Sequence, residues 1–240
     1  MISVKETQAV GRSVVEVKGL RKEYPLADEK IVALKNINLN IARGEICCIF
    51  GTSGSGKSTL LNHLAGMEKP TRGYVKIGGF PISNAGEEAI AEFRQKHLGF
   101  VFQSYNLLPM LTAVENVALP LMFRGIGKEQ RETAARQMLE RVGLSHRLDH
   151  FPSQMSGGQQ QRVGIARAFI AKPDVIFADE PTGNLDSKTT VEVMEMIKGF
   201  VKKYRQTLIL VTHDPDMAKY ADRIVTLRDG EIISDCRGDN

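Results

Sequence analysis

Residues 51–59 read GTSGSGKST, and this stretch decides the fold. It fits the pattern G-x-x-x-x-G-K-[ST], with Gly51, Gly56, Lys57 and Ser58 at the fixed positions. An apolar run at residues 45–50 precedes it and a helical pattern follows it, so the context is strand, loop, helix. The glycines allow a tight turn whose backbone N–H groups converge on phosphate oxygens, and the helix directs its positive end to the same place. The stretch therefore predicts a phosphate-binding loop in an α/β domain.

The loop also predicts which atoms meet the ligand. The residues expected to bind the nucleotide are Gly51, Thr52, Ser53, Gly54, Ser55, Gly56, Lys57, Ser58 and Thr59. The ammonium of Lys57 can reach the β- and γ-phosphates, and the hydroxyl of Ser58 can hold Mg²⁺. The loop alone does not choose among GTPases, kinases, motors and transporters. An N-K-x-D motif for reading guanine is absent, which counts against a GTPase.

Further apolar runs predict the sheet around this loop. Residues 45–50, 174–179 and 207–212 are continuously apolar, which is typical of central strands covered on both faces. Residues 13–17 and 37–41 alternate apolar and polar side chains, as half-buried strands do. A hairpin is expected at residues 223–233, around Asp229 and Gly230. The pattern predicts an α/β fold with a largely parallel sheet.

Between about residues 93 and 172 helical patterns dominate, at residues 112–123, 128–144 and 158–171. In the second pattern, four apolar residues recur at helical spacing, namely Ala135, Met138, Leu139 and Val142. We therefore predict a single domain over residues 1–240. Its α/β core spans about 13–92 and 173–233, its inserted helical subdomain about 93–172, and its polar C-terminal tail 234–240.

Two acidic residues, Asp179 and Glu180, come at the end of one predicted central strand. In parallel sheets ligands gather beyond the carboxyl ends of the strands, so Asp179 is expected to meet Mg²⁺, directly or through water. Glu180 can act as the general base that polarises the attacking water. His213 ends the next strand, and taken alone we interpret it as structural. Gln103 ends another β-like run, at residues 98–103, and alone it indicates nothing.

A second glycine-rich stretch, MSGGQQQR at residues 155–162, has almost no apolar side chain to bury. The pattern predicts exposed N–H groups and amide side chains at the start of the helix near residues 158–171. Such a helix start is a second anion site.

In this order, the motifs resemble those of the nucleotide-binding subunit of ATP-binding cassette (ABC) transporters, over roughly residues 14–233. The phosphate loop, Gln103, the stretch beginning MSGGQ, the strand VIFADE, the segment GNLD at residues 183–186, and His213 match six motifs of that family. One departure is Met155, where the family's signature usually has leucine. The resemblance implies the P-loop NTPase (RecA-like) core, with an antiparallel β subdomain and an inserted helical subdomain.

The resemblance also implies roles. Glu180, His213 and Gln103 would be catalytic, and Ser58, Gln103 and Asp179 would hold Mg²⁺. Tyr24 would stack under the adenine of ATP. Two chains would face each other head to tail, so that one chain's signature cradles the γ-phosphate of the ATP bound to its partner. The residues expected to bind nucleotide in this way are Ser156, Gly157, Gly158, Gln159 and, in the crossing loop, Asp186.

The stretches ADEPTGNLDS, LTAVENVALPL and SGGQQQR resemble the branch with macrolide exporters, lipoprotein-release machines, antimicrobial-peptide resistance pumps and the cell-division cassette. The expected partners are a second copy of the chain and an integral membrane subunit on a separate chain. The chain would lie peripherally on the cytoplasmic side of the cell membrane and power export or extraction. An alternative is an ATPase that regulates a membrane partner without transport. A cassette acting on DNA or ribosomes would need a tandem cassette or a coiled-coil insertion, and the sequence has neither.

Composition agrees with this picture. A net charge of +4 is too weak to argue for nucleic acid. Three cysteines, two of them adjacent, do not suggest disulfides. No apolar run approaches a membrane span, and residues 1–12 are too polar for a signal peptide. The apolar residues 104–111 are expected to line a groove for a cytoplasmic helix of the membrane subunit.

Overall fold

The computed structural model describes residues 13–26 and 29–238, and the polar segment at residues 1–12 lies outside them. The elements follow in this order: β1 Ser13–Leu26, β2 Glu29–Ala42, β3 Ile46–Phe50, α1 Lys57–Leu64, β4 Arg72–Ile77, α2 Glu87–His97, β5 Leu98–Phe102, α3 Ala113–Phe123, α4 Lys128–Arg141, the short 3-10 helix Pro152–Gln154, α5 Gly157–Ile170, β6 Val175–Asp179, α6 Ser187–Tyr204, β7 Thr207–Thr212, α7 Pro215–Ala218, β8 Arg223–Arg228 and β9 Glu231–Arg237.

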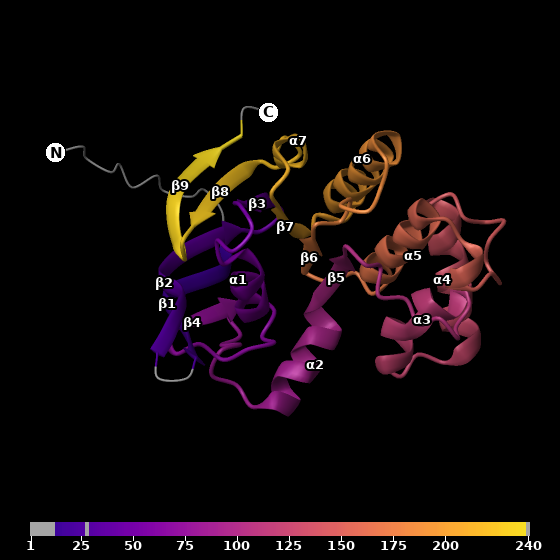
Figure 1. The fold of residues 1–240 in the computed structure, drawn as a ribbon. Coiled ribbons are helices and arrows are strands. Elements are labelled where there is room, and N and C mark those ends of the chain that lie inside the picture. The colour runs from indigo at the N-terminus through magenta and orange to yellow at the C-terminus, as the bar shows by residue number, and fades with distance from the viewer. Residues whose placement is uncertain (1–12, 27–28, 239–240) are drawn as a thin grey trace.

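Two sheets organise the chain, and Figure 1 shows the helices α3, α4 and α5 on the side of the central strands away from β1, β2 and β4. The six-stranded sheet has the order β5-β6-β7-β3-β8-β9, and the three-stranded sheet has the order β2-β1-β4. Neighbours from β5 to β8 are parallel, β9 is antiparallel to β8, and the small sheet is antiparallel throughout. The predicted fold class, with its antiparallel β subdomain and helical subdomain, is confirmed.

The central strands are apolar throughout because both of their faces are buried in separate cores. In β3, Cys47 and Ile49 pack with the small sheet and α1, whereas Ile46 and Cys48 pack with the helices on the other face. The strands β6 and β7 alternate in the same way. The helices α3, α4 and α5 complete the second core, which holds all four residues predicted from helical spacing. All three cysteines are free thiols, as the sequence predicted.

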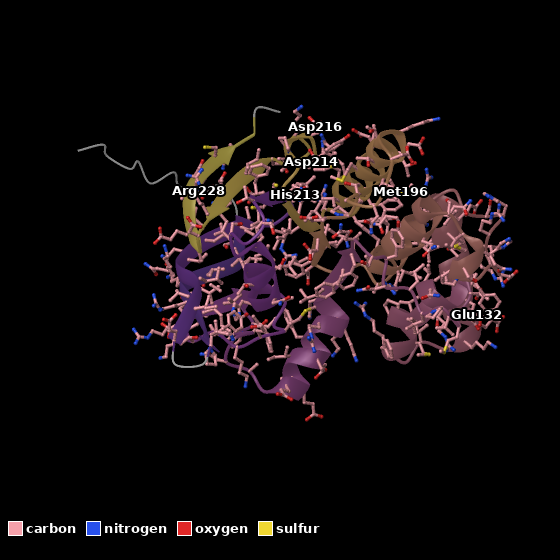
Figure 2. The ribbon with its side chains drawn as sticks, in the orientation of Figure 1. Glu132, Met196, His213, Asp214, Asp216 and Arg228 are labelled. Carbon is pink, nitrogen blue, oxygen red and sulfur yellow. The ribbon has the colours of Figure 1, made fainter. Side chains whose placement is uncertain are left out.

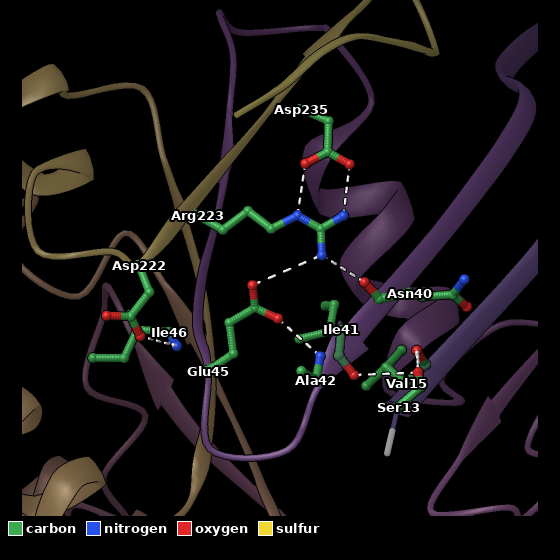
Figure 3. A network of polar contacts seen from close by, with 10 residues as sticks. All are labelled: Ser13, Val15, Asn40, Ile41, Ala42, Glu45, Ile46, Asp222, Arg223 and Asp235. Carbon is green, nitrogen blue, oxygen red and sulfur yellow. Dashed lines mark hydrogen bonds and ion pairs between the residues drawn. The ribbon is translucent and has the colours of Figure 1, made fainter. Parts of the chain in front are cut away.

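A polar network joins the two sheets at the end of the chain (Figure 3). The guanidinium of Arg223 in β8 donates two hydrogen bonds of 2.6 Å to the carboxylate of Asp235 in β9. A third hydrogen bond, of 2.7 Å, goes to the carbonyl of Asn40 in β2. Bidentate arginine–carboxylate pairs of this kind fix geometry as well as charge. The network therefore holds the C-terminal hairpin against the small sheet.

Two boundaries differ from those expected. The strand β5 pairs with β6 in the central sheet, so the helical region begins after Phe102 and not near residue 93. Residues 98–102 are too apolar on both sides to stay out of the sheet. The strand β9 continues to Arg237, so residues 234–237 belong to the sheet and not to a polar tail.

Candidate functional site

The phosphate loop joins β3 to α1, and its backbone conformation depends on glycine. Gly56 caps the start of α1 with a φ of 101°, in the left-handed region that residues with a Cβ rarely adopt. This conformation turns the chain sharply enough for Lys57 to begin the helix directly. The N-terminal amides of α1 therefore point into the loop, as the motif predicted.

The polar groups inside the loop fit a phosphate. The ammonium of Lys57 donates a 2.8 Å hydrogen bond to the carbonyl of Thr52, so the cation is folded over the loop. The Ser55 hydroxyl is buried, and within residues 13–26 and 29–238 it has no hydrogen-bond partner. The turn between β8 and β9 supports the loop from behind, because the Gly230 amide donates to the Ser55 carbonyl at 3.1 Å. A buried lysine and an unpartnered buried hydroxyl are what an anionic ligand would satisfy.

The acidic pair lies at the carboxyl end of β6, as predicted: Asp179 is the last residue of the strand and Glu180 follows it. Burial raises the pKa of Asp179, the neighbouring charge of Glu180 raises it further, and the Lys57 ammonium opposes the rise. A buried carboxylate with a raised pKa is stabilised by a cation. Ser58 and Asp179 are therefore suitable ligands for Mg²⁺, which commonly takes one or two protein oxygens together with phosphates and water.

Glu180 and His213 are brought together by β6 and β7. The Nδ1 of His213 lies 2.7 Å from a carboxylate oxygen of Glu180. Since a carboxylate accepts, Nδ1 is the donor in this contact. The Glu180 backbone has a φ of 43°, and hydrogen bonds to Val211 and Gly183 hold it there. Residues held in this region often mark functional sites. Figure 2 shows His213 between the β8–β9 hairpin and α6.

Two clefts meet at this pair. The first, of about 710 Å³, is lined by residues 53, 54 and 56–59 of the phosphate loop together with Glu180 and His213. The second, of about 720 Å³, is lined by Gln103, Gly183, Glu180 and His213. Gln103 follows β5, and its carbonyl accepts a hydrogen bond from the Asn184 amide. The structure thus groups the three predicted catalytic residues at one junction.

The signature residues lie elsewhere. Ser156, Gly158 and Gln159 line a separate cleft of about 290 Å³, together with residues of the turn after α4 and of α6. That cleft shares no lining residue with the cleft of the phosphate loop. Ser156 caps α5, because its hydroxyl accepts from the Gln159 amide and the Gln159 side chain accepts from the Ser156 amide. The amides of Gly157 and Gly158 have no partner among the described residues.

The three consecutive glutamines have three different partners. Gln159 completes the cap, and the side chain of Gln160 donates to the Met155 carbonyl at 3.1 Å. Gln161 is fully buried, contrary to the expectation of exposed amides, and donates to the carbonyl of Pro181. Because Pro181 follows Glu180, this contact links the signature helix to the acidic pair. Sequence reasoning had no signal for it.

Two predicted binding residues have local partners in the single chain. The Asp186 carboxylate caps α6, accepting from the amides of Lys188 and Thr189. Tyr24 lies in β1 opposite Ile31 of β2, and Ile31 lines the phosphate-loop cleft while Tyr24 does not. The Tyr24 hydroxyl donates to Glu68 at 2.7 Å.

We had expected the segment at residues 104–111 to line one groove. In the structure, the apolar groove near it takes only one residue from this segment. This groove, of about 250 Å³, lies between β5, α3 and α5, and the residue that it takes is Asn106. The groove is lined by Gln95, Leu98, Gly99, Phe100, Phe102, Asn106, Pro120, Phe123, Arg167, Ala168 and Ala171. Leu107 packs against the helical core, whereas Leu108 and Met110 are exposed.

The sequence also did not reveal how the Gln103 loop is attached to the signature helix. Arg167 of α5 donates to the carbonyls of Asn106 and Tyr105 at 2.6 and 2.8 Å. The Tyr105 ring reaches the first turn of the same helix, where its hydroxyl lies 2.7 Å from the position that a Cβ on Gly157 would take. The loop and the helix therefore form one packed unit.

Comparisons with known proteins agree with these motifs. A family model described as "ABC transporter" matches residues 34–183. The lipoprotein-releasing system ATP-binding protein LolD of Geobacter metallireducens is 45% identical over 93% of this chain and 99% of that protein. The macrolide export ATP-binding/permease protein MacB of Shigella flexneri is 46% identical over 92% of this chain, which spans only 34% of that protein.

A solved structure extends the likeness to three dimensions. The ATP-binding cassette MJ0796, solved as a dimer in a post-hydrolysis state bound to ADP and Pi, superposes with a TM-score of 0.87. The two sequences are 43% identical, and the match covers 93% of this chain and 98% of the other.

Proposed function

This chain belongs to the ABC transporter family as an ATP-binding, ATP-hydrolysing subunit, and we propose that two copies close head to tail around two MgATP molecules to drive a membrane protein. The observation that carries this proposal is the separation of the two phosphate-binding stretches into different clefts of one chain. A site that needs both stretches requires two chains.

Within one chain, the phosphate loop supplies most of the binding. The amides at the start of α1 and the Lys57 ammonium hold the β- and γ-phosphates, and the buried Ser55 hydroxyl gains a partner. Ser58, Asp179 and Gln103 would hold Mg²⁺, which when bound would neutralise charge on the phosphates. The ring of Tyr24 supports the adenine, and Asp186 lies in the loop that faces the partner.

Glu180 is the general base of this mechanism. Its carboxylate accepts the proton of the attacking water, and the Nδ1–H of His213 fixes the carboxylate in place. The other ring nitrogen of His213, Nε2, would face the γ-phosphate. The left-handed backbone of Glu180 presents the carboxylate at the junction of the two clefts, where the partner's signature would close the site.

The signature of the partner supplies the other half of the cradle. Gly157 and Gly158 present two unpartnered amides at the positive end of α5, and Ser156 and Gln159 cap that end. These groups suit a γ-phosphate but include no cation. Closure of two chains would add them to a phosphate that Lys57 of the other chain already holds.

The membrane subunit is proposed to dock in the apolar groove between β5, α3 and α5. An apolar groove rimmed by polar residues is a usual site for a partner helix. The groove touches Asn106 and Arg167, which bind the Gln103 loop to the signature helix, so docking and nucleotide contact share one packed unit. No helix in residues 13–26 and 29–238 is long and apolar enough to cross a membrane. We propose that the chain sits peripherally, on the cytoplasmic side of the membrane, because it would dock through this groove on a membrane subunit.

We propose export or extraction of a substrate as the work performed, since the names of the similar proteins LolD and MacB describe lipoprotein release and macrolide export. The membrane part is proposed to be a separate chain, as the match over nearly all of LolD suggests.

The test of the dimer mechanism is the dependence of ATPase rate on chain concentration. The rate per chain should rise with concentration and then saturate, because only paired chains hydrolyse ATP. Light scattering on Glu180→Gln should show a dimer with MgATP and a monomer with MgADP. A constant rate per chain under conditions where scattering finds only monomers would contradict the proposal.

A further inference from the structure

Two contacts hold the side chain of Tyr24 in β1. Its hydroxyl donates to a carboxylate oxygen of Glu68 at 2.7 Å. The Lys22 ammonium lies 4.9 Å from the centre of the ring and so covers one face. The hydroxyl and one face of the ring are therefore occupied by contacts within the chain.

Glu68 is in turn held in position by several groups. It lies in the turn after α1, where its carboxylate also pairs with Lys22 at 3.2 Å and accepts from the Asn62 amide at 3.2 Å. Its backbone carbonyl accepts from the Nδ1 of His63 at 2.9 Å. Burial opposes its ionisation, but the hydrogen bonds from Tyr24, Lys22 and Asn62 lower the pKa of the Glu68 carboxyl overall.

The connection to the phosphate site runs through one helix. Asn62 and His63 belong to α1, whose first residue is Lys57 of the phosphate loop. A nucleotide fixes the separation between its base and its phosphates, so a base platform works best when it is held at a set distance from the phosphate loop. Glu68 is the residue that joins the platform to the far end of that helix.

We propose that Glu68 is a positioning residue for the nucleotide base, which holds the Tyr24 ring, with Lys22 behind it, in the orientation that accepts adenine. The inference rests on the proposed function of Tyr24 as the adenine platform. Glu68 does not touch the nucleotide. It acts by fixing the position of the hydroxyl end of the ring and so setting the distance of the ring from α1.

The experiment compares two ligands that differ only in having a nucleoside. Dissociation constants for MgATP and for magnesium triphosphate without a base are measured by calorimetry, on the whole chain and on Tyr24→Ala, Glu68→Ala, Glu68→Gln and the double variant Tyr24→Ala/Glu68→Ala. Glu92→Ala is the matched control, because Glu92 lies on α2 and pairs only with Lys96 within the described residues. Melting temperatures are recorded for all.

The expected result is specific to the base. Tyr24→Ala should weaken MgATP roughly 5- to 150-fold, as loss of a base–aromatic stack does. Glu68→Ala should weaken MgATP about 3- to 10-fold, as loss of a hydrogen bond does. Neither variant should change binding of triphosphate. The MgATP affinity of Glu68→Gln should lie between those of the wild type and Glu68→Ala, because its amide oxygen still accepts from Tyr24. The double variant should bind MgATP no more weakly than Tyr24→Ala.

Four results would overturn the inference. Glu68→Ala could weaken both ligands equally, which would make its role a general one in α1. Glu68→Ala could weaken MgATP binding just as much when Tyr24 is already alanine. It could also leave MgATP binding unchanged although Tyr24→Ala weakens it. If Tyr24→Ala itself left MgATP binding unchanged, the platform role of Tyr24 would fail, and the inference with it. Should Glu68→Ala melt below the assay temperature, Glu68→Gln and Tyr24→Ala decide the matter alone.

Discussion

The chain has two glycine-rich helix starts that look alike in sequence but are built differently. The phosphate loop lies at the centre of the molecule, between β3 and α1, and a buried lysine and two acidic residues surround it. The signature stretch lies at the start of α5 in the helical layer, where Ser156 and Gln159 satisfy each other.

The difference lies mainly in charge. Helix α5 carries two cations, but Arg162 pairs with Glu192 at 2.6 Å and Arg167 binds the carbonyls of Tyr105 and Asn106. Arg162 lines the signature cleft, but its charge is paired with Glu192 there, and Arg167 is directed to the Gln103 loop. A pair of amides at a helix start attracts an anion only modestly, whereas amides with a lysine and a metal bind it firmly. The signature is therefore suited to complete a site that another chain has begun.

The largest expected effect on hydrolysis comes from Glu180, which lines the cleft of the phosphate loop. Glu180→Gln keeps the shape of the side chain and removes the general base. Hydrolysis should fall roughly 10²- to 10⁴-fold, or about 3–5 kcal/mol of barrier, while MgATP binding persists. Steady-state phosphate release measures the hydrolysis rate, and nucleotide titration measures MgATP binding. Turnover within a factor of two of the wild type would remove Glu180 from this role.

A second test breaks each stretch separately. Lys57→Ala removes charge-assisted hydrogen bonds to phosphate and should weaken ATP binding on the order of tenfold or more. Ser156→Arg puts bulk and charge on the face that meets the partner. It should block closure and hydrolysis while ATP binding to the single chain survives. Thr133→Arg, on an exposed position of α4, is the matched control.

Mixing the two variants sharpens this test. A heterodimer of Lys57→Ala with Ser156→Arg has one site with both defects and one site with neither. Phosphate release should therefore recover partly on mixing, up to the share of heterodimers. If activity stayed at the level of the separate variants although heterodimers formed, the two stretches would not act across chains.

Much of this comparison could be predicted from sequence, for a physical reason. The strands β3, β6 and β7 are buried on both faces, so their apolar runs are unbroken and end where Gly51, Asp179 and His213 begin the site. The hairpin turn at Asp229 and Gly230 also needs residues that tolerate positive φ, and both have it. Local rules were sufficient for these features.

Other features depend on contacts between distant segments, and no local pattern marks them. The bond from Gln161 to Pro181 joins α5 to the acidic pair across 20 residues. The hydrogen bond from Tyr24 to Glu68 spans 44 residues. The groove draws on α2, β5, α3 and α5, and of the apolar segment at residues 104–111 only Asn106 lines it. Each depends on how the elements pack.

A third prediction concerns the apolar groove between β5, α3 and α5. Phe123, at the end of α3, lines it, while its neighbour Met122 does not, although both are exposed. Phe123→Glu should weaken binding of the membrane subunit on the order of tenfold, as loss of a central aromatic contact does. Substrate movement should fall, and the basal ATPase rate and melting temperature of the lone chain should not change. Met122→Glu is the control. Leu108→Glu and Met110→Glu test the expectation that residues 104–111 contact the membrane subunit, since both side chains are exposed. If they weaken its binding as much as Phe123→Glu does, the docking surface includes this segment.

The smallest expected effect comes from α1 and α5, each of which buries a polar side chain with an atom that has no partner among the described residues. In α5 this side chain is Gln161, whose amide does not titrate between pH 5 and 7.5. In α1 it is the imidazole of His63. His63 donates from Nδ1 to the Glu68 carbonyl, so Nε2 carries a lone pair in a buried place, and a proton there would have no acceptor. Burial accordingly lowers the pKa of His63 below its ordinary value of 6.5.

The sign of the resulting pH dependence follows from linkage. Because the pKa of His63 is lower in the folded chain, the unfolded chain binds more protons below about pH 6.5. The free energy of unfolding should therefore decline as the pH falls from about 6.5 towards the lowered pKa. His63→Asn keeps a donor near Nδ1 and cannot titrate, so it should flatten that decline. Urea unfolding of both proteins between pH 7.5 and 5 measures the difference in slope. Hydrogen exchange should place the loosening in α1 and not in α5. Equal slopes, or an acid-induced opening that begins in α5, would show that the phosphate-loop helix is not the acid-sensitive member of the pair.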